Sequence, residues 1–130
     1  MTENDIAKTV VDAAYQIHKH FGPGLHESVY EVCLVHELRK RGLRVERQVA
    51  VGLRYDTIVF DEAFRADIIV EDKLILEVKA IEEIRRIHKK QLLTYLRLTN
   101  MGLGLVINFD SEYIRDGLAR VVNGLREDSN

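Results

Sequence analysis

The sequence is poor in the residues that define several classes of protein. Its 130 residues contain one cysteine, Cys33, which excludes an internal disulfide and a cysteine-based zinc cluster. Because Cys33 stands in an apolar run, a small buried side chain is the favoured interpretation. The 19 basic and 21 acidic side chains leave a net charge of only -2. Any nucleic-acid binding must therefore come from a local basic patch rather than from overall charge.

Long hydrophobic runs are also missing. No apolar stretch approaches the roughly 20 residues that span a bilayer, and residues 1–5 lack the basic and apolar segments of a signal peptide. We therefore expect a soluble, cytoplasmic protein without a membrane partner. Because 46% of the residues are apolar, the chain can bury a core of its own, and we expect residues 1–130 to form a single domain.

The spacing of apolar residues predicts both helices and strands. The predicted helices cover about residues 3–20, 26–41 and 83–99. The predicted strands cover about residues 43–53, 63–70, 74–80, 103–109 and 118–122. A strand, a helix and a strand in succession favour a parallel crossover. The pattern therefore predicts an α/β sandwich built on a mixed sheet.

The second and third predicted strands form a hairpin whose register follows from burial. The even-numbered positions of both strands are apolar and define one buried face. The polar side chains at odd positions are Arg65, Asp67, Glu77 and Lys79. The apolar faces coincide if Val70 pairs with Leu74 around a three-residue turn, since a slip by one residue would misplace half of them. Asp67 then lies opposite Glu77, with the two Cβ atoms about 5 Å apart.

Two facing carboxylates beside an amine suggest metal-assisted chemistry on phosphate. Mg²⁺ prefers oxygen ligands and commonly takes one or two carboxylates together with water and substrate phosphate. The ammonium group of Lys79, on the same face, can position water or neutralise charge that develops on phosphorus. The alternative is a pair of surface ion pairs, Asp67 with Lys79 or Glu77 with Arg65, which would contribute little. Because an Asp followed by Glu-x-Lys is a common pattern, the ion pairs are the favoured interpretation of this hairpin taken alone.

The order of several motifs resembles that of the PD-(D/E)XK nuclease superfamily. Asp67 is followed on the next strand by Glu77-Val78-Lys79, and the helix after that strand carries Gln91 and Tyr95. The Gln-x-x-x-Tyr spacing is similar to the motif that RecB-type members place after their Glu-x-Lys strand.

A second motif narrows the resemblance to one branch of the superfamily. Gly24, Glu27 and Tyr30 match Gly-x-x-Glu-x-x-Tyr, the motif that names the bacterial GxxExxY proteins. Two later segments are similar to closing segments of that family, residues 104–109 and 115–117. The resemblance covers nearly the whole chain. One departure is Ala66, which stands where the superfamily signature has proline before the first acid.

The resemblance implies a restriction-endonuclease-like fold with an ααβββαβ core and a nuclease that hydrolyses phosphodiester bonds with a metal-activated water. It implies that Asp67 and Glu77 bind Mg²⁺, for which Mn²⁺ could substitute, and that Glu27 is an additional metal ligand or a carboxylate that orients water. Lys79 would assist the water, and Gln91 would face the same cleft. The residues also have simpler interpretations, because an acid such as Glu27 is favoured in the first turn of a helix. Tyr30 is typical of core packing with a bonded hydroxyl.

The helix with Gln91 begins in a basic cluster. Its candidates for contact with substrate phosphate are Arg85, His88, Lys89 and Lys90. Such a run is otherwise an ordinary solvated helix face, and its place beside the expected cleft is what favours phosphate.

The expected partner is nucleic acid, with DNA favoured over RNA. Because the net charge of -2 counts against a strong stand-alone DNA binder, a homodimer or an accessory protein is a further expectation. The alternative function is a catalytically inactive nuclease-fold module that binds nucleic acid or a protein partner, since a fold does not fix a function.

Overall fold

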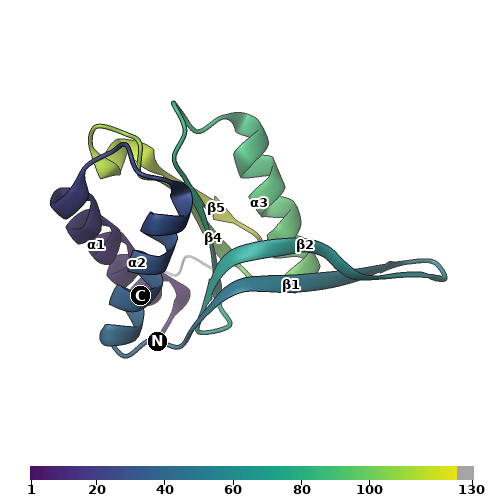
Figure 1. The fold of residues 1–130 in the computed structure, drawn as a ribbon. Helices are drawn as coiled ribbons and strands as arrows, with labels where there is room; N and C mark the ends of the chain where they lie inside the picture. The colour runs from purple at the N-terminus through teal and green to yellow at the C-terminus, as the bar shows by residue number, and fades with distance from the viewer. Residues whose placement is uncertain (126–130) are drawn as a thin grey trace.

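The computed structural model describes residues 1–125, in which five strands form one mixed sheet in the order β1-β2-β3-β4-β5 (Figure 1). The strands are β1 Val45–Tyr55, β2 Ile58–Val70, β3 Leu74–Lys79, β4 Leu103–Asn108 and β5 Leu118–Val122. Strands β3 and β4 are parallel, and all other neighbours are antiparallel. The predicted mixed sheet and the predicted parallel connection are therefore confirmed.

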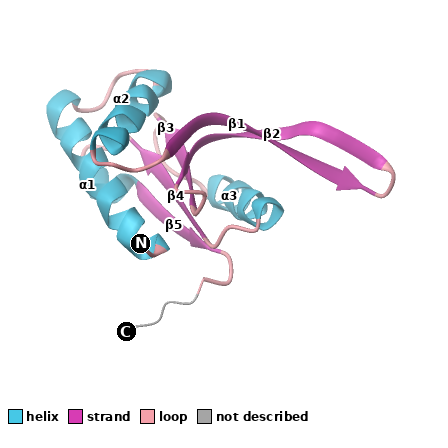
Figure 2. Ribbon diagram, turned by 90° about the horizontal axis from the view of Figure 1, so that it is seen from below, coloured by secondary structure: helices cyan, strands magenta, loops and turns pink. Residues whose placement is uncertain are grey.

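Helices cover both faces of this sheet. They are α1 Glu3–Phe21, α2 Glu27–Lys40 and α3 Arg86–Thr99, with a 3-10 turn, η1, at Ile114–Gly117. Helices α1 and α2 lie on one face and α3 lies on the other (Figures 1 and 2). The element order is the predicted ααβββαβ, extended by β5. None of the helices in residues 1–125 has the length and apolar character needed to cross a bilayer.

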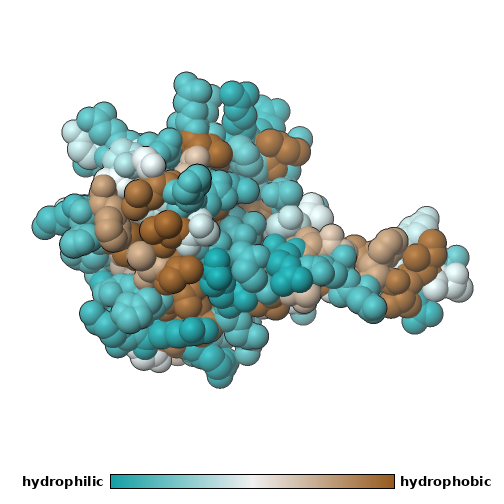
Figure 3. All heavy atoms as spheres, in the orientation of Figure 1, coloured by the Kyte–Doolittle hydropathy of each residue, from teal (hydrophilic) through white to brown (hydrophobic). Residues whose placement is uncertain are grey.

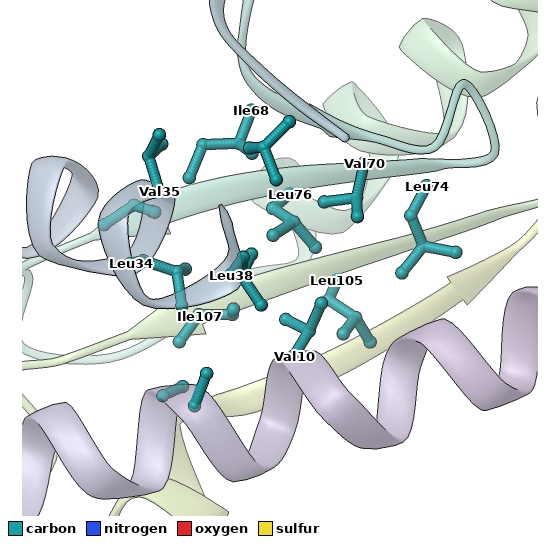
Figure 4. Close-up of a cluster of buried hydrophobic side chains, with 14 of the residues drawn as sticks. Val10, Leu34, Val35, Leu38, Ile68, Val70, Leu74, Leu76, Leu105 and Ile107 are labelled. Carbon is teal, nitrogen blue, oxygen red and sulfur yellow. The ribbon is translucent and has the colours of Figure 1, made fainter. Parts of the chain in front are cut away.

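The core is divided by the sheet into two clusters. The larger cluster packs α1 and α2 against the sheet, and its labelled members in Figure 4 include Val10, Leu38, Val70 and Leu105. The smaller cluster packs α3 on the opposite face through buried Leu92 and Leu96. Gly104 in β4 permits this close approach, because a Cβ atom there would lie 2.9 Å from the side chain of Leu92.

The predicted single apolar face of the hairpin is wrong at two positions. Ile68 and Val70 belong to the cluster under α1 and α2, whereas Phe64 and Ala66 pack in the cluster under α3. The strand changes face at Asp67, where β1 has a distortion. Arg47 pairs with Ile68 and Val49 pairs with Ala66, but Gln48, which lies between them opposite Asp67, has a left-handed φ of 55°. A local change of backbone hand breaks the alternation on which the prediction depended.

Strands β1 and β2 also extend further than the sequence predicts. Their outer parts, beyond residue 53 in β1 and before residue 63 in β2, project from the body as a two-stranded arm (Figures 1 and 2). The apolar side chains at the end of this arm are exposed and do not alternate between a buried and a solvated face. Without that alternation, the pattern gave no signal for a strand there.

Candidate active site

Asp67 and Glu77 lie together at the point where β2 and β3 separate. The predicted register is confirmed, since Val70 pairs with Leu74 and Ile68 with Leu76. Beyond Ile68 and Leu76 the carboxylates of the two strands, instead of backbone carbonyls, accept hydrogen bonds from the backbone N–H groups. The N–H of Asp67 donates to Glu77 Oε2 at 3.0 Å, and the N–H of Val78 donates to Asp67 Oδ2 at 2.9 Å. Each acid thus satisfies the backbone of the other strand while its carboxylate stays in the gap between them.

Burial sets the charge state of this pair. Glu77 is only 6% exposed, and this burial, together with the nearby charge of Asp67, raises the Glu77 pKa to about 8. Burial also raises the pKa of Asp67, and the charge of Glu31 adds to that effect. Lys79 acts in the opposite direction on both acids. Two desolvated carboxylates at one place favour either a bound proton or a bound cation.

Glu27 reaches the same region from α2, and its motif explains how. Its Oε2 accepts a hydrogen bond from the N–H of Ala80, directly after Lys79, at 3.2 Å. Gly24 adopts a φ of 109°, which favours glycine, and its N–H donates to Asp110 Oδ1 at 3.1 Å. The spacing of the Gly-x-x-Glu motif therefore fixes the loop from which Glu27 enters the site.

Tyr30 holds this loop from within the core, which confirms the simpler interpretation of this residue. Its side chain is fully buried and stacks on Phe109 with ring centroids 4.5 Å apart. The hydroxyl donates to the carbonyl of Gly22 at 2.6 Å and accepts from the N–H of Leu25 at 3.1 Å. Tyr30 thus positions the start of α2, and with it Glu27, without facing the carboxylates itself.

Glu31 and Gln48 are parts of the site that the sequence analysis missed. Glu31 is 5% exposed, and its Oε1 accepts from Gln48 Nε2 at 2.6 Å and from Arg47 Nε at 3.0 Å. The same Gln48 amide lies 3.5 Å from Asp67 Oδ1 and so joins the two acids. A signal was present, because Glu31 follows Glu27 by one helical turn and shares its face. Gln48 had no comparable signal.

Lys79 is half-buried at the end of β3, where β4 fixes the backbone. Its carbonyl accepts from the N–H of Phe109 at 2.9 Å. The buried amide of Asn108 binds both backbone groups of Ile81, with Nδ2 donating at 2.8 Å and Oδ1 accepting at 3.0 Å. Asn108 therefore holds the chain that leaves the site after Lys79. Within residues 1–125 no side chain forms an ion pair with Lys79.

Helix α3 presents one flank to the acids. Tyr95 stacks on Phe64 with ring centroids 3.8 Å apart. Burial raises the Tyr95 pKa, and the charges of Glu77 and then Asp67 add to the effect. Gln91 precedes Tyr95 by one turn and shares this flank, with its side chain exposed. The placement brings Gln91 to the expected side of the sheet.

The predicted phosphate-binding cluster is divided by the structure. His88 lies on the flank of Gln91, and its Nδ1 accepts from the N–H of Arg85 at 2.9 Å at the start of α3. Lys89 instead lines a separate pocket of about 450 Å³. The acidic residues of that pocket are Glu82, Glu83, Glu112 and Asp116. Lys90 is exposed. Lys89 is therefore not gathered with Asp67 and Glu77.

The carboxylates suit a hard divalent cation. Asp67, Glu77 and Glu27 each bind a backbone N–H through one oxygen, which orients the carboxyl group. Their second oxygens have no closer hydrogen bond in the described residues than the 3.5 Å contact of Asp67 with Gln48. Residues 1–125 do not gather three His, Cys, Asp or Glu side chains around one point. The two adjacent acids fit a cation that takes its remaining ligands from water and phosphate.

A mixed sheet between helical layers, with an acid on one strand and Glu-x-Lys on the next, defines the restriction-endonuclease-like class of α/β proteins. The family model for the PD-(D/E)XK nuclease superfamily matches residues 4–121. The chain therefore belongs to this superfamily, whose members generally use divalent metals and act as nucleases. No curated protein matches the chain, and no solved structure does.

Proposed function

We propose that residues 1–130 act as one metal-dependent nuclease domain of the GxxExxY branch, which hydrolyses phosphodiester bonds in nucleic acid, with DNA as the favoured substrate. The observation that carries the proposal is the reciprocal arrangement of Asp67 and Glu77 beside Lys79. Each acid is oriented by a backbone N–H of the neighbouring strand. Desolvated acids with perturbed pKa values beside an amine are typical of functional sites.

Each residue of the candidate site would have its own role in the reaction. Asp67 and Glu77 would hold Mg²⁺ or Mn²⁺, and Glu27, which reaches the same region from α2, would orient water beside the cation. A cation bound there would polarise the scissile phosphate and raise the acidity of water. Lys79 would orient the attacking water and offset negative charge that develops on phosphorus. Gln91, with Arg85 and His88 at the start of its helix, would contact the phosphate that enters beside Lys79.

Assignment to the GxxExxY branch is supported by the roles of its three motif residues. Gly24 supplies the left-handed backbone of the loop, Tyr30 fixes that loop through its hydroxyl, and Glu27 reaches the end of β3. All three act on one loop and one carboxylate. The motif therefore serves the position of Glu27 rather than a separate site.

The proposal also covers the compartment of the protein and its binding partners. We place the protein in the cytoplasm, in contact with nucleic acid and not with a membrane. Because the whole chain carries a net charge of -2, and Lys89 lies among acids, the positive surface beside the site is small. A second copy or an accessory protein would supply additional affinity for the substrate.

A second candidate is an inactive nuclease-fold module that binds nucleic acid or a protein. It is favoured by the hydrogen bonds of Asp67, Glu77 and Glu27, since each acid satisfies a backbone N–H whether or not it binds a cation. These bonds would preserve the acids in a protein without activity. The position of Lys79 has no such structural explanation, which favours the nuclease.

A nuclease assay separates the two candidates. Wild type, Lys79→Ala and the matched control Lys40→Ala, at an exposed position of α2, are incubated with single-stranded, duplex and branched DNA and with RNA in Mn²⁺ or Mg²⁺. The proposal predicts cleavage by wild type and by Lys40→Ala, with a loss of at least about a hundredfold in Lys79→Ala. Equal cleavage by all three preparations would indicate a contaminating nuclease. No cleavage of any substrate, together with binding, would favour the inactive module.

A further inference from the structure

The outer end of the β1–β2 hairpin exposes several large apolar side chains close together. Its last ladder pairs are Leu53 with Phe60, Arg54 with Val59, and Tyr55 with Ile58. We call residues 53–60 the arm tip. Its large apolar side chains and their exposed fractions are Tyr55 73%, Ile58 53%, Val59 65% and Phe60 47%. Figure 3 shows these apolar atoms gathered at the far end of the arm, away from the body of the molecule.

An exposed two-stranded tip of this kind calls for a partner. A two-stranded ribbon is marginally stable in water without further strands or a helix to cover its apolar side chains. Contiguous apolar surface with open strand edges is also a site of association. The arm tip is therefore best explained as one half of an interface.

The pairing of the two strands is interrupted at a defined position near Gly52, which indicates that the shape of the arm is specified by the sequence. The register of β1 against β2 shifts between Val51 and Leu53, so that residues 61–63 of β2 have no ladder partners. Gly52 lies at this shift, and a Cβ atom there would approach the carbonyl oxygen of Phe60 to 2.7 Å. The chain uses glycine where the two strands come too close for any side chain.

The charge of the arm tip argues against nucleic acid as its partner. Asp56 in the tip and Asp61 beside it outnumber Arg54, whose Nε donates to the carbonyl of Asp56 at 2.9 Å. The next arginine, Arg65, is paired with Glu62 at 2.6 Å. A net negative surface would be repelled by phosphate, so a protein partner is favoured.

The same chain has a groove of complementary character. It lies between α1 and the segment that forms η1 and β5, and its volume is about 1120 Å³. Its apolar lining includes Val11, Tyr15, Ile114 and Leu118. This volume exceeds the roughly 300–1,000 Å³ typical of small-molecule pockets, so a polypeptide segment is the more fitting occupant.

The charge of the groove is opposite to that of the arm tip. The charged side chains of its lining are Lys8, Arg115, Arg120, Asp5 and Asp12. Asp12 pairs with Arg41 at 2.7 Å, whereas Asp5 keeps its charge and accepts from the N–H of Thr2 at 3.0 Å. Lys8 and Arg115 together outweigh the remaining charge of Asp5, so the lining presents an excess of positive charge to an incoming segment.

We infer that the arm tip of one copy of this protein binds in the α1–η1–β5 groove of a second copy. Ile58, Val59 and Phe60 enter the apolar part of the groove, and the acids at the tip meet Lys8 and Arg115. The two halves of the contact lie on different parts of one chain, so two copies can exchange arms reciprocally and close into a dimer. The inference does not depend on the nuclease activity.

The first test measures self-association by sedimentation velocity over a range of protein concentrations. Wild type should form a dimer, and Val59→Asp should weaken the dimer at least about tenfold, as expected for a buried apolar anchor. The control is Ile87→Asp in α3, because Val59 and Ile87 are both 65% exposed; it should leave the dimer unchanged. Wild type that stays monomeric at every concentration, or a dimer indifferent to Val59→Asp, would overturn the inference.

The second test distinguishes the groove from other occupants. Arg115→Glu, in the groove, should also weaken the dimer, and a mixture of Val59→Asp with Arg115→Glu should recover association through the one intact arm and the one intact groove. A photo-reactive phenylalanine analogue at position 60 should cross-link to residues 8–15 or 114–118 of the other copy. Cross-links to the partner's own arm tip, or a loss of DNA binding in Val59→Asp without any dimer, would contradict the proposed contact.

Discussion

The carboxylate of Glu77 binds the backbone N–H of Asp67 at 3.0 Å, and the carboxylate of Asp67 binds the strand of Glu77 one residue further on, at 2.9 Å. The two acids that define the candidate site therefore also close the sheet where the β2–β3 ladder ends. The same two side chains thus hold the strands together and form the candidate metal site. Substitutions can separate the two roles, because stability depends on the hydrogen-bond acceptor and metal binding depends on the charge. The amide variants remove the charge, and alanine also removes the hydrogen-bond acceptor.

This difference gives a prediction for Asp67. In metal-free buffer Asp67→Asn should be as stable as wild type or more stable, because it keeps an acceptor for Val78 and removes a desolvated charge next to Glu77. Asp67→Ala should lower the free energy of unfolding by about 1–3 kcal/mol, since the N–H of Val78 loses its partner. Urea denaturation measures both. Equal destabilisation by the two variants would show that the charge, and not the acceptor, holds the strands together.

The raised pKa of Glu77 predicts how stability depends on pH. The unfolded chain loses this proton near the ordinary pKa of 4.5, whereas the folded protein keeps it until about pH 8. The free energy of unfolding of the metal-free protein should therefore fall as the pH rises from about 4.5 to about 8, by an amount on the order of a few kcal/mol. The raised pKa of Asp67 acts in the same direction. Denaturation in EDTA should show this slope in wild type and a much flatter one in Glu77→Gln.

Tyr30 should stabilise the loop before α2 through its hydroxyl. Tyr30→Phe keeps the stack on Phe109 but removes the bonds to Gly22 and Leu25. We expect a loss of about 1–3 kcal/mol in the free energy of unfolding, because two backbone groups lose a partner. The control is Tyr113→Phe, at a side chain that is 55% exposed, and it should change little. A Tyr30→Phe protein as stable as the control would remove the proposed role of the motif tyrosine.

Much of the fold and the pair of acids could be predicted because burial constrains them. Parity of the apolar positions fixed the pairing of Val70 with Leu74, and with it the approach of Asp67 to Glu77. The reversal of faces at Asp67 could not be predicted, since it depends on the left-handed φ of Gln48, a residue with no side-chain signal for that conformation. The arm escaped prediction because its apolar side chains are exposed and do not alternate between a buried and a solvated face.

Gln48 belongs to the candidate site although no motif in the sequence indicates it. Its amide joins Glu31 to Asp67, and it should orient the acid without touching substrate. Gln48→Asn tolerates the same left-handed backbone but is too short to reach both acids. We expect a loss of roughly ten- to a hundredfold in metal affinity or kcat/KM, with little change in the free energy of unfolding. A variant with full activity would make Gln48 a purely structural residue.

The most direct test of the site is the effect of divalent metal on thermal stability. Wild type, Asp67→Asn and the remote control Asp12→Asn, at an exposed position of α1, are melted in EDTA and in increasing Mg²⁺ or Mn²⁺. If Asp67 and Glu77 hold a cation, Tm should rise with metal concentration in wild type and in Asp12→Asn, and Asp67→Asn should lose most of that rise. A Tm that does not respond to metal, or that rises equally in all three proteins, would contradict a metal-dependent nuclease site at this pair of acids.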